Sequence, residues 1–219
     1  MEVSLIAHTP EPDIMAAAAA LLTHENSDFD SLKRRNAEQL KKILRAVIDM
    51  GHESVVEHAS FTFAISGVSR ALTHQLVRHR IASYSQQSQR YIEQDMHYVI
   101  PPSIKRQFAR RYREIMEEVW QLYDELKQHV PIEDARYVLP NATCSRILVT
   151  MNARSLLNFF ELRCCLHAQW EIRMLAWKML KLVREVAPTI FEKAGPPCKT
   201  KHTCPMDKKD CRWYPKKSD

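Results

Sequence analysis

The sequence predicts an α+β fold in which a mixed or antiparallel sheet is packed with long helices. Apolar residues alternate with polar ones at 3–7 and 61–65, which is typical of half-buried strands. Elsewhere they recur at helical spacing over long stretches, and a chain of 219 residues with only three glycines favours helix. Strands and helices do not alternate strictly, so a parallel α/β sheet is not expected.

The N-terminal half is expected to contain two strands and three helices. We expect a strand at 3–7, a helix from Pro12 to about 23, a helix around 40–48, a strand at 61–65 and a helix from 68 to 80. Gly51 is the predicted C-terminal stop of the second helix, which places residues 52–54 on the following turn. A loop is expected after Arg80.

The C-terminal half is expected to be mostly helical. We expect a helix from about 103 to 128, a short helical piece between Pro131 and Pro140, a strand-like run at 144–151, and helices at 156–164 and 168–186. The first of these should bury a stripe made of Phe108, Tyr112, Ile115, Val119, Leu122 and Leu126. Residues 1–195 are predicted to form a single domain, and 196–219 a tail rich in cysteine and lysine.

Composition limits the compartment and the partners. The net charge of +6 and the pI near 9.0 favour anionic partners, although lysine pairs such as Lys208-Lys209 and Lys216-Lys217 are more typical of a solvated surface. The chain has neither an N-terminal signal pattern nor an 18-residue apolar run, so we expect no membrane span and a cytoplasmic location. There, the six cysteines should be reduced thiols or ligands.

The segment from Arg78 to Tyr91 is too polar for a core, with almost nothing apolar except Ile81 and Ala82. Arg78-His79-Arg80 and Arg90 bring several guanidiniums close together, and each can grip phosphate or carboxylate oxygens two at a time. A polyanionic ligand is therefore expected. With only three glycines the chain cannot form a Gly-rich phosphate loop, so arginines and helix ends must bind any nucleotide.

A second polar group lies within an apolar segment, at Asn152, Arg154, Asn158, Arg163 and His167. Arg154 and Asn158 are four residues apart and should share a helix face, and Arg163 and His167 repeat that spacing. An amphipathic helix with a solvated polar side explains Asn152-Ala153-Arg154-Ser155 equally well.

Two further patterns raise the question of a metal. Gly51-His52-Glu53-Ser54 with Glu57-His58 lacks the H-E-x-x-H spacing of a zinc helix. In the tail, Cys198, His202, Cys204 and Cys211 could bind zinc or an iron–sulfur cluster, but their spacings fit neither zinc knuckles nor ferredoxins. We predict no metal site and leave the role of the tail open.

Three sequence blocks between Gly51 and Ile172 resemble the ThyX family, the flavin-dependent thymidylate synthases. The blocks read G-H-x-[ST]-x-x-E-H, R-H-R-x7-S with S-x-R-Y, and N-A-R-S-L-x-N-F-x-x-L-R-x-x-x-H-A-Q-W-E-I. The resemblance implies a methyltransferase that converts dUMP to dTMP, with methylenetetrahydrofolate as carbon donor and NADPH-reduced FAD as hydride source, releasing tetrahydrofolate. It also implies a homotetramer whose active sites form between subunits.

Carried over position by position, the resemblance implies roles for individual residues. The positions that match FAD-binding ones are Ser54, Glu57, Arg78, His79, Arg80, Asn152, Arg154, Asn158 and His167. The positions that match dUMP-binding ones are Gln75, Arg78, Gln86, Gln87, Ser88, Gln89, Arg90, Arg136 and Arg163. Arg163 matches the arginine that activates the uracil ring, while Ser88 and Arg90 would clamp the phosphate with help from Arg136 across the subunit boundary.

Two departures from the family pattern and two rival functions need weighing. Ser85-Gln86 replaces Asn-Glu, which leaves open how the pyrimidine edge is held, and Cys164-Cys165 are assigned to packing.

A nucleic-acid-binding module would explain the charge, but the Arg-Tyr pairs of this chain fall in separate segments, so we expect no nucleic acid partner. A purely structural protein would leave the arginine-rich segment unexplained.

Overall fold

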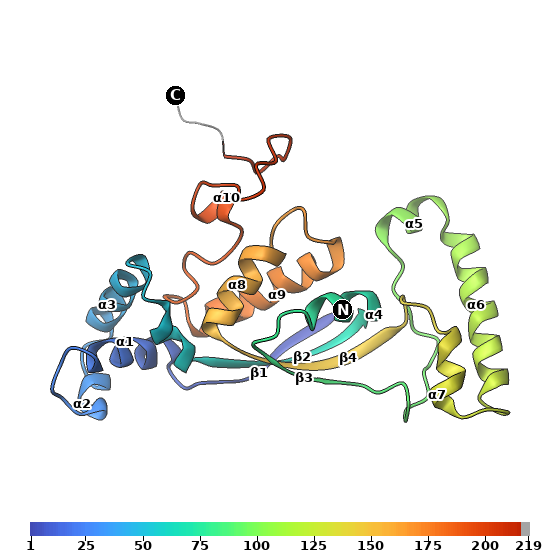
Figure 1. Cartoon of the computed structure of the whole chain (residues 1–219), viewed down its shortest axis with the longest axis horizontal. Helices are drawn as coiled ribbons and strands as arrows, with labels where there is room; N and C mark the ends of the chain where they lie inside the picture. Colours follow the sequence, from blue (N-terminus) through green and yellow to red (C-terminus); the bar gives the residue numbers. More distant parts are fainter. Residues whose placement is uncertain (216–219) are drawn as a thin grey trace. The chain divides into compact units, whose positions relative to one another are not determined.

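The computed structural model describes residues 1–215 and confirms the α+β class (Figure 1). The strands are β1 (Glu2–His8), β2 (Ser60–Ser69), β3 (Ser83–Gln86) and β4 (Cys144–Asn152). The helices are α1 (Pro12–Leu22), α2 (Phe29–Lys33), α3 (Ala37–Asp49), α4 (Arg70–Leu76), α5 (Pro102–Gln107), α6 (Ala109–Leu126), α7 (Ile132–Ala135), α8 (Ala153–Arg163), α9 (Trp170–Val186) and α10 (Pro197–Thr200). Two 3-10 helices are η1 (Glu53–His58) and η2 (Arg136–Val138). Lys216-Lys217, predicted to lie on a solvated surface, falls outside the described residues.

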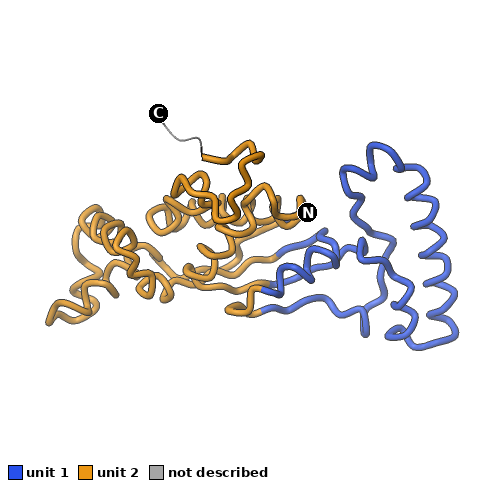
Figure 2. Tube along the Cα trace, turned by 45° about the horizontal axis from the view of Figure 1, so that its top comes forward, with its two compact units in different colours: residues 1–2, 65–78, 84–148 blue, residues 3–64, 79–83, 149–219 orange. Residues whose placement is uncertain are grey.

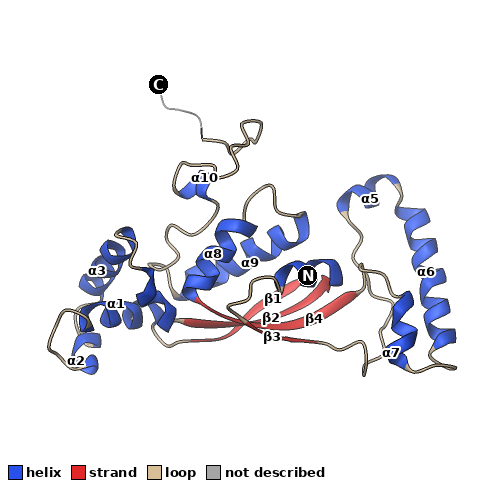
Figure 3. Cartoon of the chain, in the orientation of Figure 1, coloured by secondary structure: helices blue, strands red, loops and turns tan. Residues whose placement is uncertain are grey.

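The four strands form one sheet in the order β1-β2-β4-β3 (Figure 3). Thr9 N donates to Ser60 O at 2.9 Å, and Ser66 Oγ donates to Glu2 Oε2 at 3.2 Å. The partner number rises in one strand as it falls in the other, so β1 and β2 are antiparallel. In β2 the side chains alternate as predicted, with Phe61, Phe63 and Ile65 buried.

The described chain divides into two compact units, each made of several segments (Figure 2). Unit 1 contains residues 1–2, 65–78 and 84–148, and unit 2 contains 3–64, 79–83 and the chain from 149 onward. Each of the four strands contributes residues to both units. One of the boundaries falls between Arg78 and His79, inside the polar segment from Arg78 to Tyr91. The predicted single domain over residues 1–195 stays a prediction.

Unit 2 is built around aromatic side chains from β2, α8 and the segment after α9. Phe191 meets Phe61 edge-on at 5.4 Å between ring centroids and Phe160 at 5.8 Å. Asp13 of α1, buried, accepts hydrogen bonds from Thr189 N at 2.8 Å and Ile190 N at 3.0 Å. These contacts fix the segment after α9 on the core, so the chain stays packed beyond Pro188.

Unit 1 has its own apolar cluster, in which α6 packs against α7. Its buried members are Met116, Trp120, Tyr123 and Ala135. Trp120 Nε1 donates to Gln94 O at 3.3 Å, and Gln94 N donates to the Tyr123 hydroxyl at 3.2 Å. The indole and the phenol thus anchor the loop that follows the arginine-rich segment.

The prediction of a helix from 68 to 80 was wrong at both ends. β2 continues to Ser69, and α4 covers only Arg70–Leu76. Ser69 Oγ accepts from Leu72 N at 3.0 Å, and such an N-cap begins a helix where the sequence pattern alone suggested continuity. The expected loop also contains strand β3, after which Gln87 N donates to Arg146 O at 2.9 Å.

The long helix predicted from 103 to 128 is two helices, α5 and α6. Phe108 leaves helical geometry between them, with φ −128° and ψ 16°. Phe108 and Leu122 are exposed, so the predicted stripe was wrong at these positions, and Met116, Trp120 and Tyr123 are buried instead.

The remaining predicted elements lie close to where the sequence predicted them, and Gly51, with φ +83°, follows α3. No helix within residues 1–215 is both long and apolar enough to cross a membrane.

Candidate functional site

The residues predicted to bind FAD fall mostly in unit 2, where η1 and α8 bring four of them together. Ser54 and Glu57 lie on η1, and Arg154 and Asn158 lie one turn apart on α8. Arg154 Nη1 donates to Glu57 Oε1, and Arg154 Nε lies 3.7 Å from Glu53 Oε2. The hydrogen bond that Arg154 donates to Glu57 raises the pKa of Arg154. The guanidinium is half exposed and held in place by two carboxylates, next to an exposed amide.

Asn152 has a structural task in addition to any ligand contact. It is the N-cap of α8, and its Oδ1 accepts from Ser155 N at 2.8 Å. Its amino group takes no part in this cap and can donate to a ligand. Arg163 and His167 are four residues apart but not on one helix: α8 ends at Arg163, and His167 lies, exposed, in the connection to α9, between the two helices as the sequence predicted.

His79 and Arg163, the predicted uracil-activating arginine, are in direct contact. Arg163 Nε donates to His79 Nε2 at 3.0 Å. The His79 ring also meets Phe159 edge-on, at 4.9 Å between centroids and an interplanar angle of 80°. Burial and, secondarily, the charge of Arg163 lower the pKa of His79 to about 4 from its ordinary 6.5, so the ring is neutral near pH 7. Arg80, the next arginine of the motif, is exposed.

The residues predicted to bind dUMP lie in unit 1, apart from Arg163. Gln75 is on α4, and its Nε2 donates to Ala71 O at 3.2 Å, while Arg78 is exposed after the helix end. Gln86 closes β3, and its Nε2 donates to Thr73 Oγ1 at 3.1 Å and to Ser145 Oγ at 2.9 Å. Neither hydroxyl was identified from the sequence, and only the pairing of β3 with β4 could have indicated Ser145.

Ser88, Arg90 and Arg136 gather around the short helix α7. Ser88 Oγ accepts from Arg90 N at 3.1 Å, and Arg90 Nε donates to Glu133 Oε2 at 2.8 Å. Arg136 Nε donates to the backbone oxygen of the same Glu133 at 3.0 Å. Two predicted phosphate-binding arginines therefore meet at one residue. Sequence reasoning missed Glu133, whose only signal was its position three residues before Arg136.

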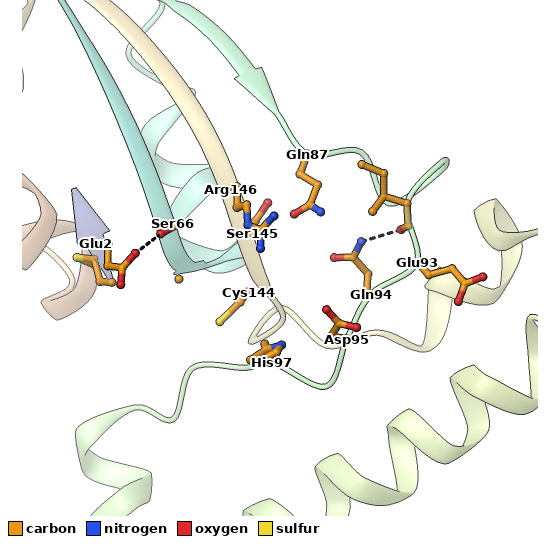
Figure 4. A pocket seen from close by; sticks show the side chains of 13 residues that line it. Glu2, Ser66, Gln87, Glu93, Gln94, Asp95, His97, Cys144, Ser145 and Arg146 are labelled. Atoms are coloured by element: carbon orange, nitrogen blue, oxygen red, sulfur yellow. Dashed lines mark hydrogen bonds between the residues drawn. The ribbon is translucent and has the colours of Figure 1, made fainter. Parts of the chain in front are cut away.

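A cavity of about 570 Å³ within unit 1 includes one residue of the predicted nucleotide set, Gln87 (Figure 4). Three carboxylates, of Glu2, Glu93 and Asp95, line it together with Arg146 on β4, the N-terminal residue Met1 and neutral polar side chains such as Ser66, Gln94 and Ser145. A lining with three carboxylates disfavours an anion. The exposed arginines described above, and not this cavity, therefore provide the groups that suit a phosphate.

The cysteines show two kinds of environment. Cys164 is fully buried, which raises the pKa of its thiol to about 12 and agrees with the predicted packing role. Burial and the neighbouring Cys165 raise the pKa of Cys198 in the tail. Trp213 packs edge-on to Trp177 of α9 at 6.4 Å, so the described part of the tail folds back on unit 2. Within residues 1–215, no three histidine, cysteine or acidic side chains gather as metal ligands.

The α+β fold and these arginine-rich clusters define an enzyme-like protein that can hold anionic ligands, and comparison with known proteins gives its family. The family described as "Thymidylate synthase complementing protein" matches residues 4–189. The flavin-dependent thymidylate synthase of Geobacter sulfurreducens is 49% identical over 218 residues, covering 96% of this chain and 94% of the relative. That of Clostridium tetani is 45% identical, covering 96% and 93%.

A solved structure supports the same relationship. It is described as a UMP/dUMP methylase, PolB, from Streptomyces cacaoi, bound with 5-Br dUMP. It matches with a TM-score of 0.78 and 25% identity, covering 87% of this chain and 93% of the other. The chain belongs to the family of flavin-dependent thymidylate synthases.

Proposed function

We propose that this protein methylates dUMP to dTMP as a flavin-dependent thymidylate synthase, with methylenetetrahydrofolate as carbon donor and NADPH as reductant. Family membership over nearly the whole chain supports the reaction, and the relatives' names support a flavin. The observation that carries the proposal is the arrangement of its arginines. Within unit 1, Arg90 and Arg136 both donate to Glu133, and within unit 2, Arg163 donates to His79.

The side chains predicted for the cofactor fit FAD by their chemistry. A dinucleotide carries a pyrophosphate, for which the exposed Arg80 and Arg154 supply guanidiniums and Asn158 an amide. When bound, FAD supplies the reducing equivalents that the methylation requires. We assign Ser54, Glu57 and His167 to the same site, with Arg78 shared between FAD and dUMP.

The chain's own residues then bind and polarise the nucleotide. Ser88, Arg90 and Arg136 clamp the phosphate through charge-assisted hydrogen bonds, and Gln75, Gln86, Gln87 and Gln89 surround the nucleoside. Arg163 stabilises negative charge that develops on the uracil ring as carbon 5 attacks the one-carbon unit.

We further propose a homotetramer with sites shared between subunits, and a synthase domain over residues 1–195. The family match at 4–189 supports that boundary. The six free cysteines, none of them in a disulfide, suit a reducing compartment such as the cytoplasm.

The proposed function is tested by omitting one substrate at a time. NADPH should bleach the absorbance at about 450 nm that an oxidised flavin shows. The colour should return, and dTMP should form, only when dUMP and methylenetetrahydrofolate are both added. Stoichiometric dihydrofolate among the products, or equal dTMP formation by flavin-free protein, would refute the proposal.

A further inference from the structure

Arg163 is held by a contact that does not use its terminal amino groups. It is the last residue of α8, and its Nε donates to His79 Nε2 at 3.0 Å. Both residues belong to unit 2. The two terminal nitrogens of the guanidinium point away from Nε, so this hydrogen bond leaves their hydrogens for a ligand.

The contact fixes the protonation state of His79. A guanidinium has only donors, so the imidazole nitrogen that faces it must carry a lone pair. The proton of His79 is therefore on Nδ1, and the ring is neutral. Its partly buried position beside a permanent cation favours this state, and its lowered pKa agrees with it.

Helix α8 holds the His79 ring from two positions one turn apart. Phe159, fully buried, packs edge-on to the ring, and Arg163 follows four residues later on the same face. Phe159 in turn packs edge-on to Phe160 in the core of unit 2, at 5.7 Å between centroids. The acceptor that receives Arg163 Nε is thus fixed against the core.

We propose that His79 is a positioning residue for Arg163: its neutral Nε2 anchors the guanidinium through Nε and leaves the two terminal amino groups for the uracil ring. This rests on the proposed function, in which Arg163 polarises uracil. It assigns His79 a task different from that of its exposed neighbours Arg78 and Arg80, because its side chain acts on Arg163 and not on the flavin.

Two substitutions in the FAD-loaded protein test the proposal. His79→Phe keeps a ring against Phe159 but cannot accept a hydrogen bond, whereas His79→Gln keeps a neutral acceptor. For His79→Phe we expect retained FAD, and flavin reduction by NADPH within about twofold of wild type. The kcat for dTMP should fall about 10- to 100-fold with little change in KM for dUMP, because a catalytic group displaced by about an ångström loses that much rate. His79→Gln should recover most of the loss.

Coupling to Arg163 provides the decisive comparison. Arg163→Lys keeps the charge but lacks the Nε donor, so adding His79→Phe to it should cost no further activity. Wild-type kcat in His79→Phe, no rescue by His79→Gln, or additive losses in the double variant would overturn the proposal. Loss of FAD or slowed flavin reduction in His79→Phe would instead assign this side chain to the flavin, which also overturns it. A wild-type protein that makes no dTMP would refute the proposed function, and the role of Arg163 with it.

Discussion

The arginines of the candidate site differ in whether a carboxylate partner already neutralises their charge. Arg163 has one hydrogen bond to a neutral histidine, whereas Arg90 and Arg154 are each paired with a carboxylate. A group that must stabilise charge developing during a reaction is more effective when its own charge is not already neutralised by a partner. This difference distinguishes the predicted catalytic arginine from those predicted to bind ligands.

Replacing Arg163 with alanine should therefore abolish dTMP formation while leaving the fold and the bound FAD intact. Only polarisation of the uracil ring is lost, so flavin reduction by NADPH should continue. Steady-state dTMP assays and flavin absorbance measure the two effects. Arg110→Ala, at a fully solvated position on α6, is the control and should behave as wild type. Near-normal turnover by Arg163→Ala would remove Arg163 from the mechanism.

Glu133 already holds Arg90, the residue that we propose binds the dUMP phosphate. The pair is about half exposed, so solvent screens its attraction, but a phosphate must still replace or share it. Glu133→Gln should tighten dUMP binding only modestly, about 2- to 5-fold, and leave deoxyuridine binding unchanged. Calorimetric titrations measure both, with Glu114→Gln as control for an exposed carboxylate paired with arginine on α6. Unchanged or weaker dUMP binding would show that Glu133 does not oppose the phosphate.

Gln86 occupies a position where a carboxylate would be destabilising. Thr73 Oγ1 donates its hydrogen to Arg70 O at 3.0 Å, so it can only accept from Gln86, which fixes the orientation of the amide. Gln86→Glu would place an acceptor opposite this acceptor and should cost about 1–3 kcal/mol of unfolding free energy. Denaturant unfolding measures it, against Gln121→Glu at an exposed position of α6. Equal stability of the two variants would contradict this account of the departure from the family's Asn-Glu.

At the scale of elements, sequence periodicity predicted the strands and most helices, but capping and packing decided their ends. The alternation at Phe61, Phe63 and Ile65 was sufficient for β2, because a half-buried strand shows its period directly. The start of α4 could not be predicted, since it depends on a cap by Ser69 that the apolar pattern does not reveal. α5 and α6 separate at Phe108, which leaves helical geometry although the helical pattern predicted one continuous helix.

The candidate site was predictable only as a set of residues. The three sequence blocks identified His79 and Arg163, but the hydrogen bond between residues 84 positions apart requires the fold. Thr73, Ser145 and Glu133 were missed for the same reason, because each becomes relevant through a neighbour that the sequence does not place beside it.

Asp13 joins two elements that are distant in sequence, α1 and the segment after α9. Its buried carboxylate accepts from the backbone of Thr189 and Ile190, so Asp13→Ala would leave two buried N–H groups without this acceptor. We expect a loss of about 2–4 kcal/mol in unfolding free energy, and a smaller loss for Asp13→Asn, which keeps one acceptor oxygen. Denaturant unfolding measures both. Asp49→Ala, which removes only an exposed pair with Lys193, is the control, and an equally small effect at Asp13 would contradict the argument.

On the scale of the whole molecule, the two units divide the predicted ligand sets between them. The dUMP-binding positions other than Arg163 belong to unit 1, and the FAD-binding positions other than Arg78 belong to unit 2. The chain passes from one unit to the other between Arg78 and His79. Neighbouring residues of one motif therefore belong to different units: Arg78, which is predicted in both ligand sets, to unit 1, and His79, which contacts Arg163, to unit 2.

His79 also makes the stability of the whole protein depend on pH. Its pKa is about 4 in the folded protein and 6.5 ordinarily, so between these values the unfolded chain binds more protons. Stability is therefore fully present above about pH 6.5 and falls as the pH drops toward 4. The loss should be about 1–2 kcal/mol, because solvent screens a half-buried ring and reduces the full effect of the shift. Denaturant unfolding between about pH 7.5 and 5 measures the slope, in a range where acidic side chains of ordinary pKa stay ionised. His79→Phe cannot bind the proton and should flatten the slope; an unchanged slope in that variant would mean that other groups cause it.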